Sequence, residues 1–214
     1  MKLAAVSLLP LLAETRTWYR AVDVRFLPSA IATGHTRVIP SRFYDPHSAS
    51  PQFPTLYLSD SQVVAMFEAQ ALFGSPTTPG GSVPAPRGAW AILSVSVRLQ
   101  RIADLSVVAS QALLDTSVQE LTGDWVGYRQ RSSLTNVAAP TGTAPTQALG
   151  EALHRDPRLI EGFIAVSAKV PYNQNLIVFP AHLGAGSSVD YAWQDASGSH
   201  TYRVDQNNPG GYYP

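Results

Sequence analysis

The stretch Thr55-Leu56-Tyr57-Leu58-Ser59-Asp60-Ser61-Gln62-Val63-Val64-Ala65-Met66-Phe67-Glu68 combines strand, cap and helix signals in immediate succession. Its first apolar residues, 56–58, predict a short strand, and the polar residues 59–61 offer side chains that cap a helix N-terminus. We expect the helix to run from Gln62 to Phe73. Because that segment is apolar on nearly every side, the pattern predicts a helix that is buried all round.

Glu68 is the only charged residue in the expected helix. Val64 lies four residues before it and Leu72 four residues after it, which places the carboxylate on an apolar stripe. An ionised carboxylate there must be paired, hydrogen-bonded or turned into a cleft, because leaving it dry and alone costs on the order of several kcal/mol. Glu68 is therefore the best single candidate for a functional residue; the alternative is an ordinary residue at the border with solvent.

Composition narrows the possible functions. The chain has 214 residues, enough for one well-cored domain, and its 15 Lys and Arg balance 15 Asp and Glu. We therefore expect no direct nucleic-acid partner and no membrane surface. The absence of cysteine excludes disulfides and a Cys nucleophile, and the five histidines lack ligand spacing, which predicts no metal site. Only 14% of residues are charged, so some apolar surface is expected to meet a partner or a second copy.

The remaining pattern predicts an α+β single domain with mixed or antiparallel sheets and few helices. Strands are expected at 17–22, 89–99, 163–167 and 176–179, and a terminal hairpin at 191–204. Helical segments are expected within 104–121 and from a Thr146 cap through His154, while the long irregular segment 29–54 is expected to line a site. We divide the chain into an N-terminal segment at 1–17, a main domain at 18–186 and an aromatic, partly mobile tail at 187–214.

Motifs for phosphate loops, dinucleotide folds, serine elbows and zinc proteases are absent. What stands out are polar residues in apolar surroundings: Arg20, Tyr57, Glu68 and Ser167, with Arg42 in the long loop. Two arginines suit a pyrophosphate, a tyrosine suits stacking on a ring, and a glutamate suits a ribose hydroxyl or an oxocarbenium centre. The alternatives are surface ion pairs for the arginines, a core position for the tyrosine with its hydroxyl bonded to backbone, and for the serine a tolerated small residue on a strand.

Four further residues with rings are expected to have structural positions only. Trp90 and Trp125 are expected in the core, and His35 and His154 on the surface.

Several segments, taken in order, resemble the RES domain family over roughly residues 18–179. They are Trp18-Tyr19-Arg20, Ser41-Arg42-Phe43-Tyr44-Asp45-Pro46, Leu56-Tyr57-Leu58-Ser59-Asp60-Ser61 with Glu68, Asp124-Trp125, Pro145-Thr146-Gln147-Ala148-Leu149-Gly150, Gly162-Phe163-Ile164-Ala165-Val166-Ser167 and Asn175-Leu176-Ile177-Val178-Phe179. The arginine, glutamate and serine of the family name would correspond to Arg20 or Arg42, Glu68 and Ser167. The chain departs from the family's usual Gly-Gly-Arg-Trp-Asn-Pro-Pro segment, since it has neither glycine there.

The resemblance implies the toxin of a bacterial type II toxin-antitoxin system, located in the cytoplasm, with an ADP-ribosyltransferase-like fold. It also implies an antitoxin partner with an Xre-like helix-turn-helix domain, and a homodimer or a toxin-antitoxin hetero-oligomer. Characterised members deplete NAD by hydrolysis or phosphorolysis of the nicotinamide glycosidic bond. The open alternatives are an ADP-ribosyltransferase that modifies a protein, and a module that binds a nucleotide or a partner without catalysis.

The resemblance also assigns residue roles. Arg20 and Arg42 would hold the phosphates of NAD, which is a substrate here; no cofactor is expected. Tyr57 would pack against the nicotinamide or ribose, and Tyr19 would join the NAD-binding residues. Glu68 would bond the ribose and stabilise positive charge at the anomeric carbon, with Arg20 and Ser167 completing the catalytic group.

Overall fold

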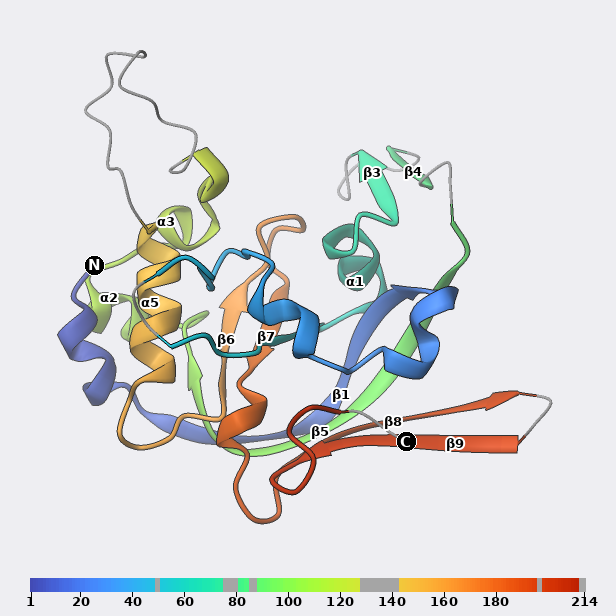
Figure 1. Ribbon diagram of the computed structural model, residues 1–214. Helices are drawn as coiled ribbons and strands as arrows, with labels where there is room; N and C mark the ends of the chain where they lie inside the picture. Colours follow the sequence, from blue (N-terminus) through green and yellow to red (C-terminus); the bar gives the residue numbers. More distant parts are fainter. Residues whose placement is uncertain (49–50, 75–80, 85–87, 128–142, 196–197, 212–214) are drawn as a thin grey trace.

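A seven-stranded mixed sheet forms the centre of the molecule (Figure 1). The computed structural model describes residues 1–48, 51–74, 81–84, 88–127, 143–195 and 198–211. In spatial order the strands are β1 (Leu11–Asp23), β2 (Leu56–Ser59), β7 (Gln174–Val178), β6 (Gly162–Val166), β5 (Trp90–Asp104), β8 (Ser188–Asp195) and β9 (Gly198–Asp205). A separate small sheet pairs β3 (Leu72–Gly74) with β4 (Ser82–Pro84).

The long strands β1 and β5 close part of this sheet on itself. They pair antiparallel from Leu11 opposite Ala103 to Asp23 opposite Trp90, with one register shift between Leu12 and Glu14. β1 also pairs with β2 and β5 also pairs with β6, so β1, β2, β7, β6 and β5 form a continuous circuit. Since β5 and β6 are parallel and the other pairs antiparallel, the expected mixed α+β class is confirmed.

Short helices surround the sheet on two sides (Figure 1). The α-helices are α1 (Gln62–Glu68), α2 (Val108–Leu114), α3 (Val118–Thr122) and α5 (Pro145–His154). The 3-10 helices are η1 (Leu3–Leu8), η2 (Val24–Ser29), η3 (Gly34–Arg37) and η5 (Pro180–His182). α2, α3 and α5 gather near the N-terminus, at the left of Figure 1, whereas α1 lies with β3 and β4 at the upper right. The β8–β9 hairpin extends to the right, away from α2, α3 and α5.

The sheet is buried on both faces by two hydrophobic cores. Ile164 and Leu176 pack in the core formed with β1, β5 and the terminal hairpin, while their neighbours Phe163 and Ile177 pack in the core formed with the helices near the N-terminus. Successive residues of a strand point to opposite faces, so a continuous apolar run is what such a strand requires. Gly162 begins β6 where a Cβ would lie only 2.5 Å from the Ile177 carbonyl oxygen.

The helix after β2 is shorter and less buried than the sequence predicts. Ser61 caps its N-terminus by accepting from the Val64 amide, as expected, but α1 ends at Glu68 because Gln70 adopts a left-handed conformation with φ of 60°. The chain then enters β3, so Leu72 does not share a helix with Glu68. Val63 is 51% exposed, which shows that the expected burial on all sides is wrong.

The other expected elements are largely confirmed. β1 and β5 contain the predicted strands and are longer, β6 and β7 match theirs, and the terminal hairpin exists with Val189 and Val204 fully buried. Thr146 does not cap α5, since Ala144 holds the N-cap position and Thr146 is buried in the first turn. His154 is not a simple surface residue, because it stacks between Phe53 and His182. The Thr-, Ala- and Pro-rich composition of residues 132–146 also predicts a loop, but most of this segment lies outside the described residues.

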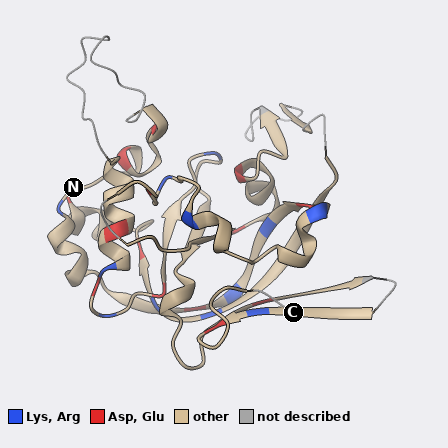
Figure 2. Cartoon of the chain, viewed as in Figure 1, with Lys and Arg blue, Asp and Glu red and all other residues tan. Residues whose placement is uncertain are grey.

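Charged residues are interspersed along the fold (Figure 2), in keeping with the balanced composition. Among the described residues, no helix has the length and apolar character needed to cross a bilayer.

Glu161, immediately before β6, joins β5 to the segment at 184–187 through its buried carboxylate. It is fully buried and accepts hydrogen bonds from the backbone amides of Gln100, Arg101 and Gly184, the Ser187 hydroxyl and the Arg101 guanidinium. We expect Glu161→Ala to lower the free energy of unfolding by about 3–5 kcal/mol, because buried donors then lose their acceptor. Urea denaturation measures this change.

Arg155→Ala provides the control. Arg155 forms an exposed pair with Glu151, so its removal should change stability by less than about 1 kcal/mol. Equal losses for the two variants would contradict the anchoring role of Glu161.

The environment of His154 predicts that the folded protein loses stability in acid. Burial, with His182 and Arg155 nearby, lowers the pKa of His154 from 6.5 to about 4. The unfolded chain therefore binds a proton that the folded chain excludes, and stability falls as the pH drops from 6.5 towards 4. Thermal melts at pH 7 and 4.5 should show a smaller acid loss in His154→Phe than in the parent protein, whereas the exposed control His47→Gln should behave like the parent. An undiminished loss in His154→Phe would refute the assignment.

Candidate functional site

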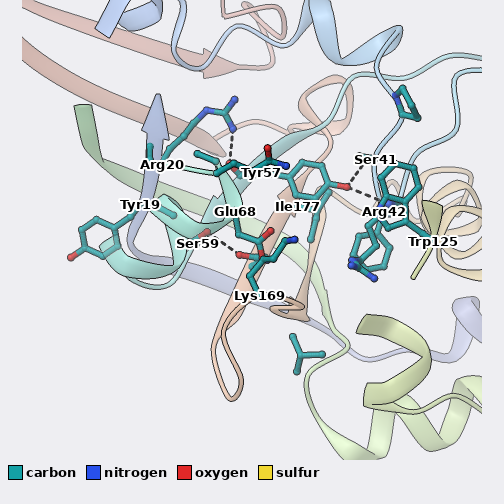
Figure 3. Close-up of a pocket in the computed structure, with 18 of the residues that line it drawn as sticks. Tyr19, Arg20, Ser41, Arg42, Tyr57, Ser59, Glu68, Trp125, Lys169 and Ile177 are labelled. Carbon is teal, nitrogen blue, oxygen red and sulfur yellow. Dashed lines mark hydrogen bonds between the residues drawn. The ribbon is translucent and has the colours of Figure 1, made fainter. Parts of the chain in front are cut away.

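A cavity of about 490 Å³ opens between α1, the loop at 40–43 and the strands β1, β2 and β7 (Figure 3). Its walls bring together residues that lie far apart in the chain. Those that concern the site are Tyr19, Arg20, Ser41, Arg42, Tyr57, Ser59, Glu68, Trp125, Lys169 and Asn175. Five of the six residues proposed from the sequence therefore line one cavity; the sixth, Ser167, does not line it but donates a hydrogen bond to Glu68.

Glu68 lies at the last turn of α1 with its carboxylate held on one side. Its Oε1 accepts from the Ser167 hydroxyl at 2.8 Å and from the Asn175 side-chain amide at 2.6 Å. Oε2 accepts no hydrogen bond from any described residue. The side chain is exposed to the cavity, so one oxygen is fixed and the other is available to a ligand.

The two residues that hold Glu68 are themselves fixed. The Ser167 hydroxyl accepts from the backbone amides of Lys169 and Val170, both at 3.1 Å. Asn175 accepts from the buried Ser59 hydroxyl at 2.9 Å, so its amide group is oriented with the NH2 towards Glu68. These bonds stabilise the anion at a helix C-terminus, where the helix dipole alone would disfavour it.

Arg20 projects from β1 and has no acidic partner among the described residues. Its Nη1 donates to the Tyr57 carbonyl oxygen at 2.7 Å, and its buried Nε has no hydrogen-bond partner among the described residues. Burial lowers the pKa of Arg20 to about 10, which still leaves the guanidinium charged at neutral pH. The expected alternative, a surface ion pair, is thus contradicted: Arg20 is a largely buried cation that forms no ion pair with any described residue.

Arg42 faces the cavity from the irregular loop. Its guanidinium donates to the carbonyl oxygens of Leu121 and Gly123 at the end of α3, a position that attracts a cation. Burial lowers the pKa of Arg42, while Glu68, Tyr57 and Asp124 oppose that shift. The change from the family's glycine-containing pattern therefore leaves an arginine on the cavity wall, opposite the carboxylate in Figure 3.

Tyr57 binds the loop that carries Arg42. Its hydroxyl pairs with the Ser41 hydroxyl at 2.7 Å and accepts from the Phe43 amide at 3.3 Å, and burial raises its pKa to about 12. Gln147 of α5 binds the same loop, because its side-chain amide donates to the Ser41 and Tyr44 carbonyl oxygens. Gly150 allows α5 to approach, since a Cβ there would lie 1.9 Å from the Phe43 carbonyl oxygen.

Sequence reasoning missed several residues of the site. Asn175 carries a signal that could have found it, because it is a polar residue beginning an apolar strand segment, the criterion that selected Ser167. Trp125 was expected in the core but lines the cavity, and Trp90 lines a second one. Lys169 had no sequence signal; its position near Glu68 follows from the turn between β6 and β7.

Fold and site define a single-domain α+β protein in which one carboxylate and two arginines share a cavity. The family model described as the RES domain matches residues 17–202, and the chain belongs to this family. Among solved structures, a chain of the M. tuberculosis MbcT-MbcA toxin-antitoxin complex matches with a TM-score of 0.55 and 20% identity, over 82% of this chain and 80% of the other. A search of curated proteins finds no match.

The role of Tyr57 in positioning the loop can be tested by amide exchange. We expect Tyr57→Phe to speed exchange of the Phe43 amide about tenfold, since a lost hydrogen bond of about 1.4 kcal/mol corresponds to that factor. Hydrogen–deuterium exchange with mass spectrometry measures it. Tyr172→Phe is the matched control, because Tyr172 is fully exposed. Unchanged exchange at Phe43 in Tyr57→Phe would show that the hydroxyl does not hold the loop.

Proposed function

We propose that this RES domain protein cleaves the nicotinamide–ribose bond of NAD and thereby acts as the toxin of a toxin-antitoxin pair. The observation that carries the proposal is the Glu68 carboxylate, with Oε1 fixed by Ser167 and Asn175 and Oε2 directed at no described partner. Membership of the RES family and the fold shared with a chain of a toxin-antitoxin complex support the proposed biological role.

The chemistry of the leaving group explains why one carboxylate is enough. Nicotinamide in NAD is a cationic ring, so the electron pair of the breaking C–N bond neutralises it and no proton donor is needed. Positive charge develops instead on the ribose as an oxocarbenium ion. A fixed anion beside that centre stabilises the transition state more than the ground state. Glu68 fits this role, and it also suits a hydrogen bond from a ribose hydroxyl.

The cationic residues supply the complementary binding. Arg20 is a buried guanidinium with no anionic partner in the described part of the chain, and Arg42 adds a second cation on the cavity wall. Guanidinium groups bind phosphate oxygens through directed, charge-assisted hydrogen bonds. We assign the diphosphate of NAD to Arg20 and Arg42, with Tyr19 as a further NAD-binding residue. Tyr57 would act mainly by holding the Arg42 loop.

The reaction then balances with an external acceptor. Water attacks the anomeric carbon as the C–N bond breaks, which yields ADP-ribose, nicotinamide and a proton; phosphate in place of water yields a phosphorylated ADP-ribose. Ser167 acts through Glu68, to which it donates. In this proposal NAD is the substrate and no cofactor takes part.

The partner follows from the same proposal. A toxin that depletes NAD must be neutralised, and we propose an antitoxin with an Xre-like helix-turn-helix domain, acting in the cytoplasm. The matched solved structure is named as a toxin-antitoxin complex, which supports a protein partner for this fold.

Glu68→Gln tests the chemistry directly. We expect loss of nicotinamide release from NAD by at least about 100-fold, because the amide keeps the shape of the side chain but removes the charge that stabilises the transition state. Purified protein is incubated with NAD, with and without phosphate, and nicotinamide is quantified by chromatography. Asp60→Asn is the control. Asp60 follows β2, accepts hydrogen bonds from the Asn173 side chain and the Gln174 amide, and does not line the cavity.

The outcomes separate the competing functions. Nicotinamide release that depends on Glu68 supports cleavage, and its dependence on phosphate identifies the acceptor. If the parent protein releases no nicotinamide, this function is rejected. A macromolecule that becomes labelled in a lysate with radiolabelled NAD would then establish the ADP-ribosyltransferase. If no macromolecule is labelled, the non-catalytic binding module is favoured.

A further inference from the structure

A chain of buried hydrogen bonds ends at the carboxylate of Glu68. Ser59 and Asn175 are only 4% and 9% exposed, although both have polar side chains. Ser59 donates to Asn175 Oδ1 at 2.9 Å, and Asn175 Nδ2 donates to Glu68 Oε1 at 2.6 Å. Buried polar groups cost free energy unless they are bonded, and these two are bonded to each other and then to the anion.

The strand pairing fixes where the amide of Asn175 lies. Ser59 and Asn175 are register partners of β2 and β7, so their side chains are neighbours on one face of the sheet. β7 is also paired with β6 over its whole length. Because a shift of one residue would turn Asn175 to the other face, the pairing on both sides keeps the donor directed at the end of α1.

The two ends of the amide group have different partners. The Asn175 carbonyl oxygen accepts from Ser59, so the NH2 group faces Glu68. A reversed amide would place its oxygen against the carboxylate with no proton between them, and the Ser59 hydroxyl would lose its acceptor. A donor on a carboxylate oxygen favours the charged form of the group. Ser59 therefore acts through Asn175, and Asn175 acts through Glu68.

We propose that Asn175 and Ser59 are positioning residues of the reaction: Ser59 fixes the Asn175 amide, which holds the Glu68 carboxylate charged and turned with Oε2 towards the ligand. The inference rests on the proposed function, in which Glu68 stabilises the cationic ribose. Neither side chain needs to touch the reacting atoms for this role.

Other ionisable side chains surround the same carboxylate. Among the residues that line the cavity, they are Tyr19, Arg20, Arg42, Tyr57 and Lys169. Arg42 and Tyr57 interact electrostatically with Glu68. Lys169 lies close to the carboxylate in Figure 3, whereas the Arg20 guanidinium points away from it. A substitution at residue 175 leaves all five in place, so its effect on the carboxylate reports on the amide donor.

Asn175→Asp tests the proposal, because it keeps the shape of the side chain and replaces the donor with a second carboxylate. Two carboxylates within hydrogen-bond distance share a proton at neutral pH, so Glu68 becomes fully charged only at higher pH. We expect kcat for nicotinamide release to fall at least about tenfold at pH 7, with KM for NAD within about threefold of the parent. The acid limb of the pH–rate profile should move up by about one unit or more. Nicotinamide release by the purified protein from pH 5 to 9 measures these changes.

Asn173→Asp is the matched control. Asn173 also donates to a carboxylate, that of Asp60 at 3.1 Å, but it does not line the cavity. The same added charge two residues away should leave kcat, KM and the acid limb as in the parent. Equal pH–rate profiles for Asn175→Asp and the parent would overturn the proposal. Equal shifts in the two variants would also overturn it, since added charge rather than contact with Glu68 would then be the cause.

Ser59 is tested by loss and rescue. Ser59→Ala removes the bond that fixes the amide and should lower kcat about threefold or more with KM unchanged. Ser59→Thr keeps a hydroxyl, and its methyl group has room because Ser59 lines the cavity, so kcat should return towards that of the parent. An unchanged kcat in Ser59→Ala, or an equal loss in Ser59→Thr, would remove Ser59 from the proposed role.

A measurement without turnover separates this proposal from the proposed function. In 13C-labelled protein, NMR follows the Glu68 carboxyl carbon through a pH titration. The midpoint of its chemical-shift change should lie about one pH unit or more higher in Asn175→Asp than in the parent and in Asn173→Asp. If the parent releases no nicotinamide but this shift occurs, Asn175 controls Glu68 and the catalytic role falls. If Glu68→Gln abolishes release while Asn175→Asp shifts neither titration nor pH–rate profile, cleavage stands and the positioning role is overturned.

Discussion

The pairing of β1 with β5 along nearly their whole length is the constraint on which the rest of the structure depends. It closes the circuit in which β2 pairs with β1 and β7 pairs with β2, and it holds Arg20 at a fixed position where it lines two cavities. A guanidinium buried without an acid costs free energy in the unliganded protein. Such a group is maintained only where surrounding packing is strong enough, and the continuous strand pairing supplies that support.

The Glu68 carboxylate is positioned by side-chain hydrogen bonds rather than by strand pairing. Glu68 lies at the end of a short helix, and its orientation comes from Ser167 and Asn175 on the neighbouring sheet. Ser59 fixes Asn175 in turn, so the strand that precedes the helix also controls the side chain at its end. Cation and anion are thus positioned by separate parts of the fold, which keeps them from neutralising each other directly.

The arginine loop shows how a departure from a family pattern is accommodated. Phe43, where the family pattern has tryptophan, is buried and packs edge-on against Phe163 with ring centroids 4.9 Å apart. Tyr44 is buried and donates to the Arg37 carbonyl oxygen. With Tyr57 and Gln147 bonded to the same loop, the backbone is fixed by side chains rather than by glycine turns, and Arg42 still lines the cavity.

The strands, the mixed α+β class and most of the charged and polar residues of the site could be predicted from the amino-acid pattern alone. Alternating or continuous apolar runs have a direct physical cause in burial, and isolated polar residues within them are costly unless used. Three features could not be predicted in this way: α1 ends at Glu68, Trp125 and Trp90 line cavities, and Asn175 orients the carboxylate. These features depend on a left-handed residue and on contacts between distant strands, which local patterns do not encode.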